Sequence, residues 1–156
     1  MRFLLTRANT NLTEKKLMQD NQKKIFIDSN VIIYAYSNSE IAKQKIARRI
    51  VKENYTVIST QVLQEMCNTL GRKYMIDYSS IKDTLQECIN SNNEIHTNHQ
   101  HTILKACDIA KRYSFSFYDS LIISAALESN CSVLYSEDLQ HNQIIDDVLT
   151  IKNPFI

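Results

Sequence analysis

The sequence contains very little glycine, proline and tryptophan. Its 156 residues include one Gly, one Pro and no Trp. The G-x-G-x-x-G and G-x-x-x-x-G-K loops each need at least two glycines, so this composition excludes the common backbone cradles for nucleotide phosphates. Long apolar runs are also missing. The unbroken apolar runs are only a few residues long, whereas a membrane-spanning helix needs ~20 apolar residues. We therefore expect a protein that neither binds phosphates through such loops nor enters a membrane.

An excess of charge of one sign is missing as well. The 18 Lys and Arg residues and the 17 Asp and Glu residues give a formal net charge of +1. This balance excludes a strongly polycationic nucleic-acid-binding protein, but it allows a local basic face. The predicted helix over residues 40–53 carries such a face, formed by Lys43, Lys45, Arg48, Arg49 and Lys52. It is either a solvated helix surface or a contact for RNA phosphates, with Arg48, Arg49 and Lys52 as the candidate contacts.

Cysteine pairs with metal-binding spacing do not occur. The four cysteines lie about 20 residues apart along the chain, at Cys67, Cys88, Cys107 and Cys131. Each stands in an apolar stretch, which favours reduced core thiols over a zinc site or disulfides. The first residues contain an apolar patch too short for a secretory signal. Reduced thiols are typical of a reducing compartment, so we expect a cytoplasmic protein.

The length suits one domain. Residues 1–22 are polar and show no clear hydrophobic period, and we expect them to form a weakly ordered N-terminal extension. From there the pattern sharpens, so we place a single domain over residues 23–156.

Short apolar runs alternate with segments of helical period along this domain. The runs at 25–27, 57–59 and 132–135 are typical of buried strands. Amphipathic helices are predicted over residues 40–53, from residue 60 onward, and over 79–89, 99–113 and 118–129. This alternation predicts an α/β fold in which a mostly parallel sheet is covered by helices on both faces.

Residues 96–113 begin with three histidines and continue as a helix. His96, His99 and His101 share no helical face, so we expect solvated loop histidines rather than a metal site. The residues of helix 99–113 expected to face the core are Ile103, Leu104, Cys107 and Ala110.

Four acidic residues are placed where an open parallel sheet binds its ligands, beyond the carboxyl ends of the strands. Asp28 and Asp138 follow predicted strands, and Glu65 and Asp119 lie in the first turns of predicted helices. Each alone has a structural explanation, as a turn former or a partner of the helix dipole. Four carboxylates at one edge would repel one another, and a divalent cation removes that cost. Ligand sets of oxygen alone favour Mg²⁺ or Mn²⁺ over zinc.

Four segments resemble a known family. IFIDSNVI at 25–32, STQVLQE at 59–65, FYDSLIISAAL at 117–127 and LYSEDLQH at 134–141 are similar to the four acidic motifs of PIN domains. The likeness is closest to the VapC-type toxins of bacterial type II toxin–antitoxin systems, and it covers residues 24–156. It implies a three-layer α/β/α PIN-like fold with its acidic site at the strand carboxyl ends. It also implies an endoribonuclease that uses Mg²⁺ or Mn²⁺, inhibited by a cognate antitoxin and assembled as a homodimer.

The resemblance assigns roles to particular residues. It implies that the catalytic and metal-binding residues are Asp28, Glu65, Asp119 and Asp138. It also implies that Asn30 and Ser136 orient ligands or water. In the antitoxin complex, a cationic side chain would pair with the carboxylates, and helical residues 40–70 would form the contact.

The C-terminal tail departs from the family pattern. Residues 144–149 predict a β-hairpin with two Asp residues in the turn. Asn142 and Asp147 stand where relatives often have glycine. Both residue types tolerate a positive φ better than other non-glycine residues, so we expect the same fold with slightly strained turns.

Two other functions stay open at this point. One is a phosphatase of the haloacid dehalogenase type with Asp28 as the nucleophile, although that class needs a second Asp where Asn30 stands. The other is a catalytically inactive PIN-like module that binds RNA or protein.

Overall fold

A six-stranded sheet runs through the centre of the protein. The structure, a computed structural model, describes residues 23–156. The predicted extension over residues 1–22 lies outside the described residues. The strand order is β3-β2-β1-β4-β6-β5. All neighbouring strands are parallel except β5 and β6. The strands are β1 (Lys24–Ile27), β2 (Tyr55–Ser59), β3 (Glu94–His96), β4 (Val133–Tyr135), β5 (Ile144–Ile145) and β6 (Leu149–Lys152).

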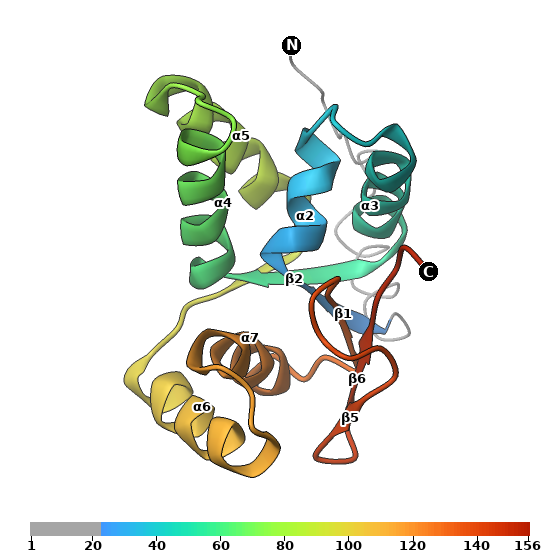
Figure 1. Cartoon of the computed structure of the whole chain (residues 1–156), viewed down its shortest axis with the longest axis vertical. Helices are drawn as coiled ribbons and strands as arrows, with labels where there is room; N and C mark the ends of the chain where they lie inside the picture. The colour runs from blue at the N-terminus through green and yellow to red at the C-terminus, as the bar shows by residue number, and fades with distance from the viewer. Residues whose placement is uncertain (1–22) are drawn as a thin grey trace, which may run out of the picture.

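Helices cover the sheet from two sides. They are α2 (Ser29–Tyr36), α3 (Ile41–Glu53), α4 (Thr60–Arg72), α5 (Tyr78–Ser91), α6 (Gln100–Tyr113) and α7 (Phe117–Glu128). Figure 1 shows α2, α3, α4 and α5 on one side of β2, and α6 and α7 on the other. The predicted three-layer α/β/α fold with a mostly parallel sheet is confirmed. None of the helices in residues 23–156 is both long and apolar enough to cross a bilayer.

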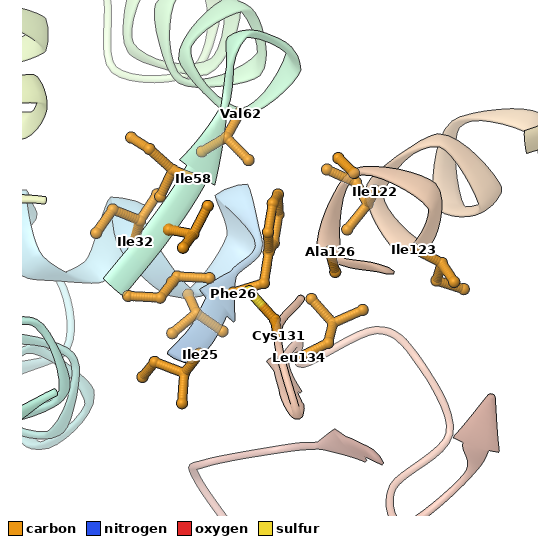
Figure 2. Packing of buried hydrophobic residues seen from close by; sticks show 14 of the residues in the cluster. Ile25, Phe26, Ile32, Ile58, Val62, Ile122, Ile123, Ala126, Cys131 and Leu134 are labelled. Atoms are coloured by element: carbon orange, nitrogen blue, oxygen red, sulfur yellow. The ribbon is translucent and has the colours of Figure 1, made fainter. Parts of the chain in front are cut away.

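The core is centred on β1, the strand in the middle of the sheet. Phe26 is completely buried, and Figure 2 shows side chains from β2, α4, α7 and β4 gathered around it. Helix α7 is buried on almost every side, because every residue from Ser120 to Ala126 is buried. A helix buried all round must lie between other layers, and α7 lies between α6 and the sheet.

Two elements differ from the sequence prediction. Helix α2 was not among the predicted helices; it begins directly after Asp28, at Ser29, and buries Val31 and Ile32. Strand β3 was also not expected, and it places His96 opposite Ser59 of β2. The prediction of a solvated loop histidine is therefore wrong for His96, whose side chain is 14% exposed.

The buried face of α6 also differs from the prediction. Ile103 and Leu104 are exposed, and the helix instead buries Thr102, Ala106 and Ile109. Small Ala106 allows α6 to lie close to α7. The buried Thr102 hydroxyl donates a hydrogen bond of 2.7 Å to Glu128 of α7, so a polar residue is accepted in this interface.

Because α6 buries a different face from the predicted one, one cysteine prediction is also corrected. Cys88 and Cys131 are buried core thiols, as expected, and burial raises the pKa of each to about 12. Cys67 is half-buried. Cys107 lies on the exposed face of α6, so its prediction as a core thiol is wrong.

The C-terminal hairpin forms as predicted. Strands β5 and β6 pair antiparallel, and Val148 N–H donates to the Ile145 carbonyl across the turn. Asp146 and Asp147 have positive φ values of 49° and 57°, as a type I′ turn requires. Asn142 also has a positive φ, of 64°. The predicted strain at Asn142 and Asp147 is thus present in the backbone.

We expect Asp147→Gly to raise the free energy of unfolding by about 0.5 kcal/mol, because glycine adopts this backbone conformation without steric cost. Asp146→Gly is the matched control. Its carboxylate accepts hydrogen bonds from Arg112 and Tyr113, so removing it should lower the stability. Urea unfolding measures both values, and a less stable Asp147→Gly would contradict the assignment of strain.

Candidate active site

The sheet brings the end of β1 next to the end of β4. Ile27 and Tyr135 are paired in the parallel register, so the residues that follow them, Asp28 and Ser136, are neighbours. The Ser136 hydroxyl donates a hydrogen bond of 2.9 Å to Asp28 Oδ2, and both side chains are buried. The strand pairing therefore determines where this carboxylate lies.

Asp28 is also the N-cap of α2. Its Oδ1 accepts a hydrogen bond of 2.6 Å from the backbone N–H of Ser29. A carboxylate at this position satisfies a free N–H group and faces the positive end of the helix dipole. One side chain therefore links the sheet edge to α2.

Asn30 connects Asp28 to Asp138. Its Nδ2 lies 2.9 Å from Asp138 Oδ2 and 3.3 Å from Asp28 Oδ2. Its Oδ1 accepts a hydrogen bond from the backbone N–H of Glu137. Asn30 thus fixes the loop that carries Asp138, while the Asp138 side chain stays exposed.

Glu65 reaches the same region from α4. The Ser29 hydroxyl donates a hydrogen bond to Glu65 Oε2, and Gln61 Nε2 donates one of 2.8 Å to Oε1. Ser29 belongs to α2 and Gln61 to α4, so two helices determine the orientation of this carboxylate.

Asp119 lies in the first turn of α7. The Ser116 hydroxyl accepts from the Asp119 backbone N–H at 3.2 Å, and it lies 2.7 Å from Asp119 Oδ2. Ser116 is the N-cap of the helix. The cap determines where α7 starts and thereby places Asp119, which is half-buried.

Negative charge accumulates around Asp28. Burial raises the pKa of Asp28 to about 6, and the charges of Glu65 and Asp119 add to this rise. Hydrogen bonds from Ser136 and from Ser29 N–H act in the opposite direction. Glu65 of α4 and Asp119 of α7 therefore both lie near enough to Asp28 for their charges to disfavour its ionised form.

Several residues of this network were not singled out from the sequence. Ser29 and Gln61 hold Glu65, and Ser116 holds Asp119. Ser29 and Gln61 stand inside the quoted motifs, and Gln61 precedes Glu65 by one helical turn. That i, i+4 spacing was the available signal.

An ion pair holds the loop after β4 from its other side. Lys43 of α3 pairs with Glu137, and its ammonium lies 4.6 Å from the centre of the Tyr34 ring. The Tyr34 hydroxyl donates to Glu137 Oε2 at 3.1 Å. Since Glu137 precedes Asp138, this contact connects α3 to the acidic loop.

The candidate RNA contacts on α3 divide into two kinds. Arg49 and Lys52 are exposed, whereas Arg48 is half-buried and its Nε donates a hydrogen bond of 2.8 Å to the Ala35 carbonyl. Arg48 therefore ties α3 to α2. Arg49 and Lys52 remain accessible at the surface of α3.

The histidines form a separate group. His96 contacts Glu128 at 3.1 Å, His99 is the N-cap of α6, and His101 is exposed. Within residues 23–156, no group of three or more His, Cys, Asp or Glu side chains, either here or among the four acids, is arranged so that it could hold a metal ion as it stands.

The part of the chain that carries the acidic site matches the model of a known family. Residues 25–145 match the family model described as PIN domain. The chain belongs to the PIN domain family. The match spans all four acidic positions, and it confirms the resemblance inferred from the motifs.

Two solved structures share the fold of this PIN domain. VapC20 from Mycobacterium tuberculosis, described as a Sarcin-Ricin loop cleaving toxin, has a TM-score of 0.59 at 16% identity, with 73% of this chain and 89% of that chain covered. A chain of VapBC2 from Rickettsia felis, bound to a DNA fragment from its promoter, has a TM-score of 0.56 at 17% identity, with 83% and 98% covered. Comparison with curated protein sequences gives no significant match.

We expect Asp28→Asn to stabilise the metal-free protein at neutral pH. The pKa of Asp28 in the folded state lies above its ordinary value of 3.8, so ionisation costs folding free energy. The cost is absent below pH ~4, grows as the pH rises, and is complete above pH ~7, where it amounts to roughly 1–3 kcal/mol. Asparagine removes this cost and keeps the helix cap.

Urea unfolding in EDTA, across this pH range, measures the difference between the two proteins. Asp108→Asn on the exposed surface of α6 is the control and should change little. A difference for Asp28→Asn that does not vary with pH would contradict the assignment.

Proposed function

We propose that this PIN domain is an Mg²⁺- or Mn²⁺-dependent endoribonuclease that hydrolyses RNA phosphodiester bonds. The observation that carries the proposal is the hydrogen-bond network that joins Asp28, Glu65 and Asp138 through Ser29, Asn30 and Ser136. Gln61 connects Glu65 to the Tyr118 carbonyl, next to Asp119. Neighbouring carboxylates repel one another without a cation, as the raised pKa of Asp28 shows, and retaining all four acids points to a cation-dependent function.

The donor set fits a hard divalent cation. The residues that would hold it are Asp28, Glu65, Asp119 and Asp138, which offer oxygen atoms alone. When such a cation is bound, the chemistry it supplies is activation of water and neutralisation of charge at the phosphodiester.

The chain's own residues prepare this site. The Ser136 hydroxyl and the Ser29 N–H favour the ionised form of Asp28, which is the form that binds a cation. Asn30 donates to Asp138 and so keeps an exposed carboxylate directed to the same site. Since each of these donors belongs to β1–α2 or to the loop after β4, the arrangement exists before substrate arrives.

We further propose that the protein is the toxin of a type II toxin–antitoxin system in the cytoplasm. The description of VapC20 as a toxin supports this assignment through the shared fold. A cognate antitoxin would contact residues 40–70 and pair a cationic side chain of its own with the carboxylates. A homodimer also stays a prediction, and the exposed Ile103 and Leu104 of α6 would provide apolar surface for it.

The alternative is an inactive PIN module that binds RNA or protein. Membership of the PIN family sets aside the phosphatase with Asp28 as nucleophile. Loss of one or more acids would favour an inactive module, but all four are present.

Cleavage of structured RNA tests the proposal. The protein should cut a mixture of structured RNAs with Mn²⁺ or Mg²⁺ and stop in EDTA. Asp28→Asn and Asp119→Asn should lower the rate by about 100-fold or more, since even outer-shell partners of a metal contribute 10–100-fold. Asp108→Asn should cut like the wild type. RNA binding without cutting under any of these conditions would favour the inactive module.

A second measurement tests the basic face of α3. Arg49→Glu with Lys52→Glu should weaken RNA binding and reduce the slope of log affinity against log salt by about 2, because each phosphate contact contributes about 1. Lys82→Glu with Lys111→Glu is the matched control, because it changes the net charge by the same amount but on α5 and α6. An unchanged slope in the α3 variant would reject phosphate contact there.

A further inference from the structure

Gln61 is a buried polar side chain that touches two parts of the acidic site. It lies on α4 one turn before Glu65 and is 4% exposed. Its Nε2 donates a hydrogen bond of 2.8 Å to Glu65 Oε1 and another of 3.1 Å to the backbone carbonyl of Tyr118. Tyr118 directly precedes Asp119. Gln61 therefore bridges the helix that carries Glu65 and the helix that carries Asp119.

The chemistry of its partners fixes the orientation of the amide. Glu65 offers a carboxylate oxygen and Tyr118 a carbonyl oxygen, and both can only accept hydrogen bonds. A reversed amide would place its own oxygen against two oxygens. Both N–H donors of the Gln61 amide are thus used, one for each helix.

The second oxygen of Glu65 is held independently. The Ser29 hydroxyl donates to Glu65 Oε2, and Ser29 also lies beside Asp28. Both oxygens of Glu65 are therefore anchored, one toward Asp28 and one toward Asp119. Of these two contacts, only the one through Gln61 relates Glu65 to α7.

A role in stability alone explains Gln61 poorly. Its Oε1 is buried without a hydrogen-bond partner among residues 23–156. An unsatisfied buried carbonyl oxygen is destabilising, and an apolar side chain of the same length would avoid that cost. The amide is present in spite of this cost, in contact with a carboxylate of the site.

We propose that Gln61 is a positioning residue, which sets the spacing between Glu65 and Asp119 so that the two carboxylates act on the same cation. The inference rests on the proposed function. Gln61 itself touches neither cation nor substrate in this role. It acts through Glu65 and through the start of α7.

The test compares Gln61→Met with Gln64→Met in the full chain. Gln64 is exposed on the same helix, so it controls for the same chemical change without the bridge. The probe is MnCl2, titrated calorimetrically. Gln61→Met should bind Mn²⁺ about 10–100-fold more weakly than the wild type, as expected for loss of an outer-shell contact. Gln64→Met should bind it like the wild type.

Two further readouts separate positioning from folding. RNA cutting by Gln61→Met should fall at limiting Mn²⁺ and recover at saturating Mn²⁺. Its midpoint of unfolding by urea in EDTA should equal or exceed that of the wild type. Glu65 is half-buried, so water can replace the donor that it loses, and the orphaned oxygen of Gln61 is removed.

Unchanged Mn²⁺ affinity in Gln61→Met would overturn the proposal. If Gln61→Met fails to fold, Gln61→Leu takes its place, and failure of both variants to fold would show a structural role and overturn it as well. A wild type that binds Mn²⁺ without cutting RNA would contradict the proposed nuclease activity only. The Mn²⁺ affinities of the wild type and of Gln61→Met would still decide the role of Gln61. A wild type that binds no Mn²⁺ would overturn both.

Discussion

The rest of the site depends on one buried carboxylate at the end of β1. Asp28 accepts hydrogen bonds from α2 through Ser29 and from the β4 loop through Ser136. It therefore joins β1, α2 and the end of β4 at one point. Burial disfavours its charged form, and the nearby acids disfavour it further. Backbone and hydroxyl donors offset part of this cost.

The fold and the acidic positions could be predicted because their signals are local. A short apolar run that ends in Asp, such as IFID at 25–28, shows both a buried strand and its polar end. Parallel strands then place such ends at one edge, so Asp28 and Asp138 follow from the alternation of elements. The turn at Asp146 and Asp147 was equally local, since few residue types accept its backbone angles.

The parts that could not be predicted depend on tertiary contacts. The helical period of α6 leaves two candidate faces, and packing against α7 selects the one with Thr102 and Ala106 over the one with Leu104. Strand β3 is too short to show a period. The bridge by Gln61 joins residues 57 positions apart in the sequence, and no local pattern reveals such a contact.

The pairing of β1 with β4 also determines when the acidic site can assemble during protein synthesis. Asp28 and its hydrogen-bond partner Ser136 are 108 residues apart, as are Asn30 and Asp138. Contacts of such high sequence separation require closure of a long loop and form late in folding. A chain still emerging from the ribosome holds β1 long before it holds β4. The complete acidic site therefore appears only when synthesis is nearly finished, and an interrupted or truncated chain never assembles it.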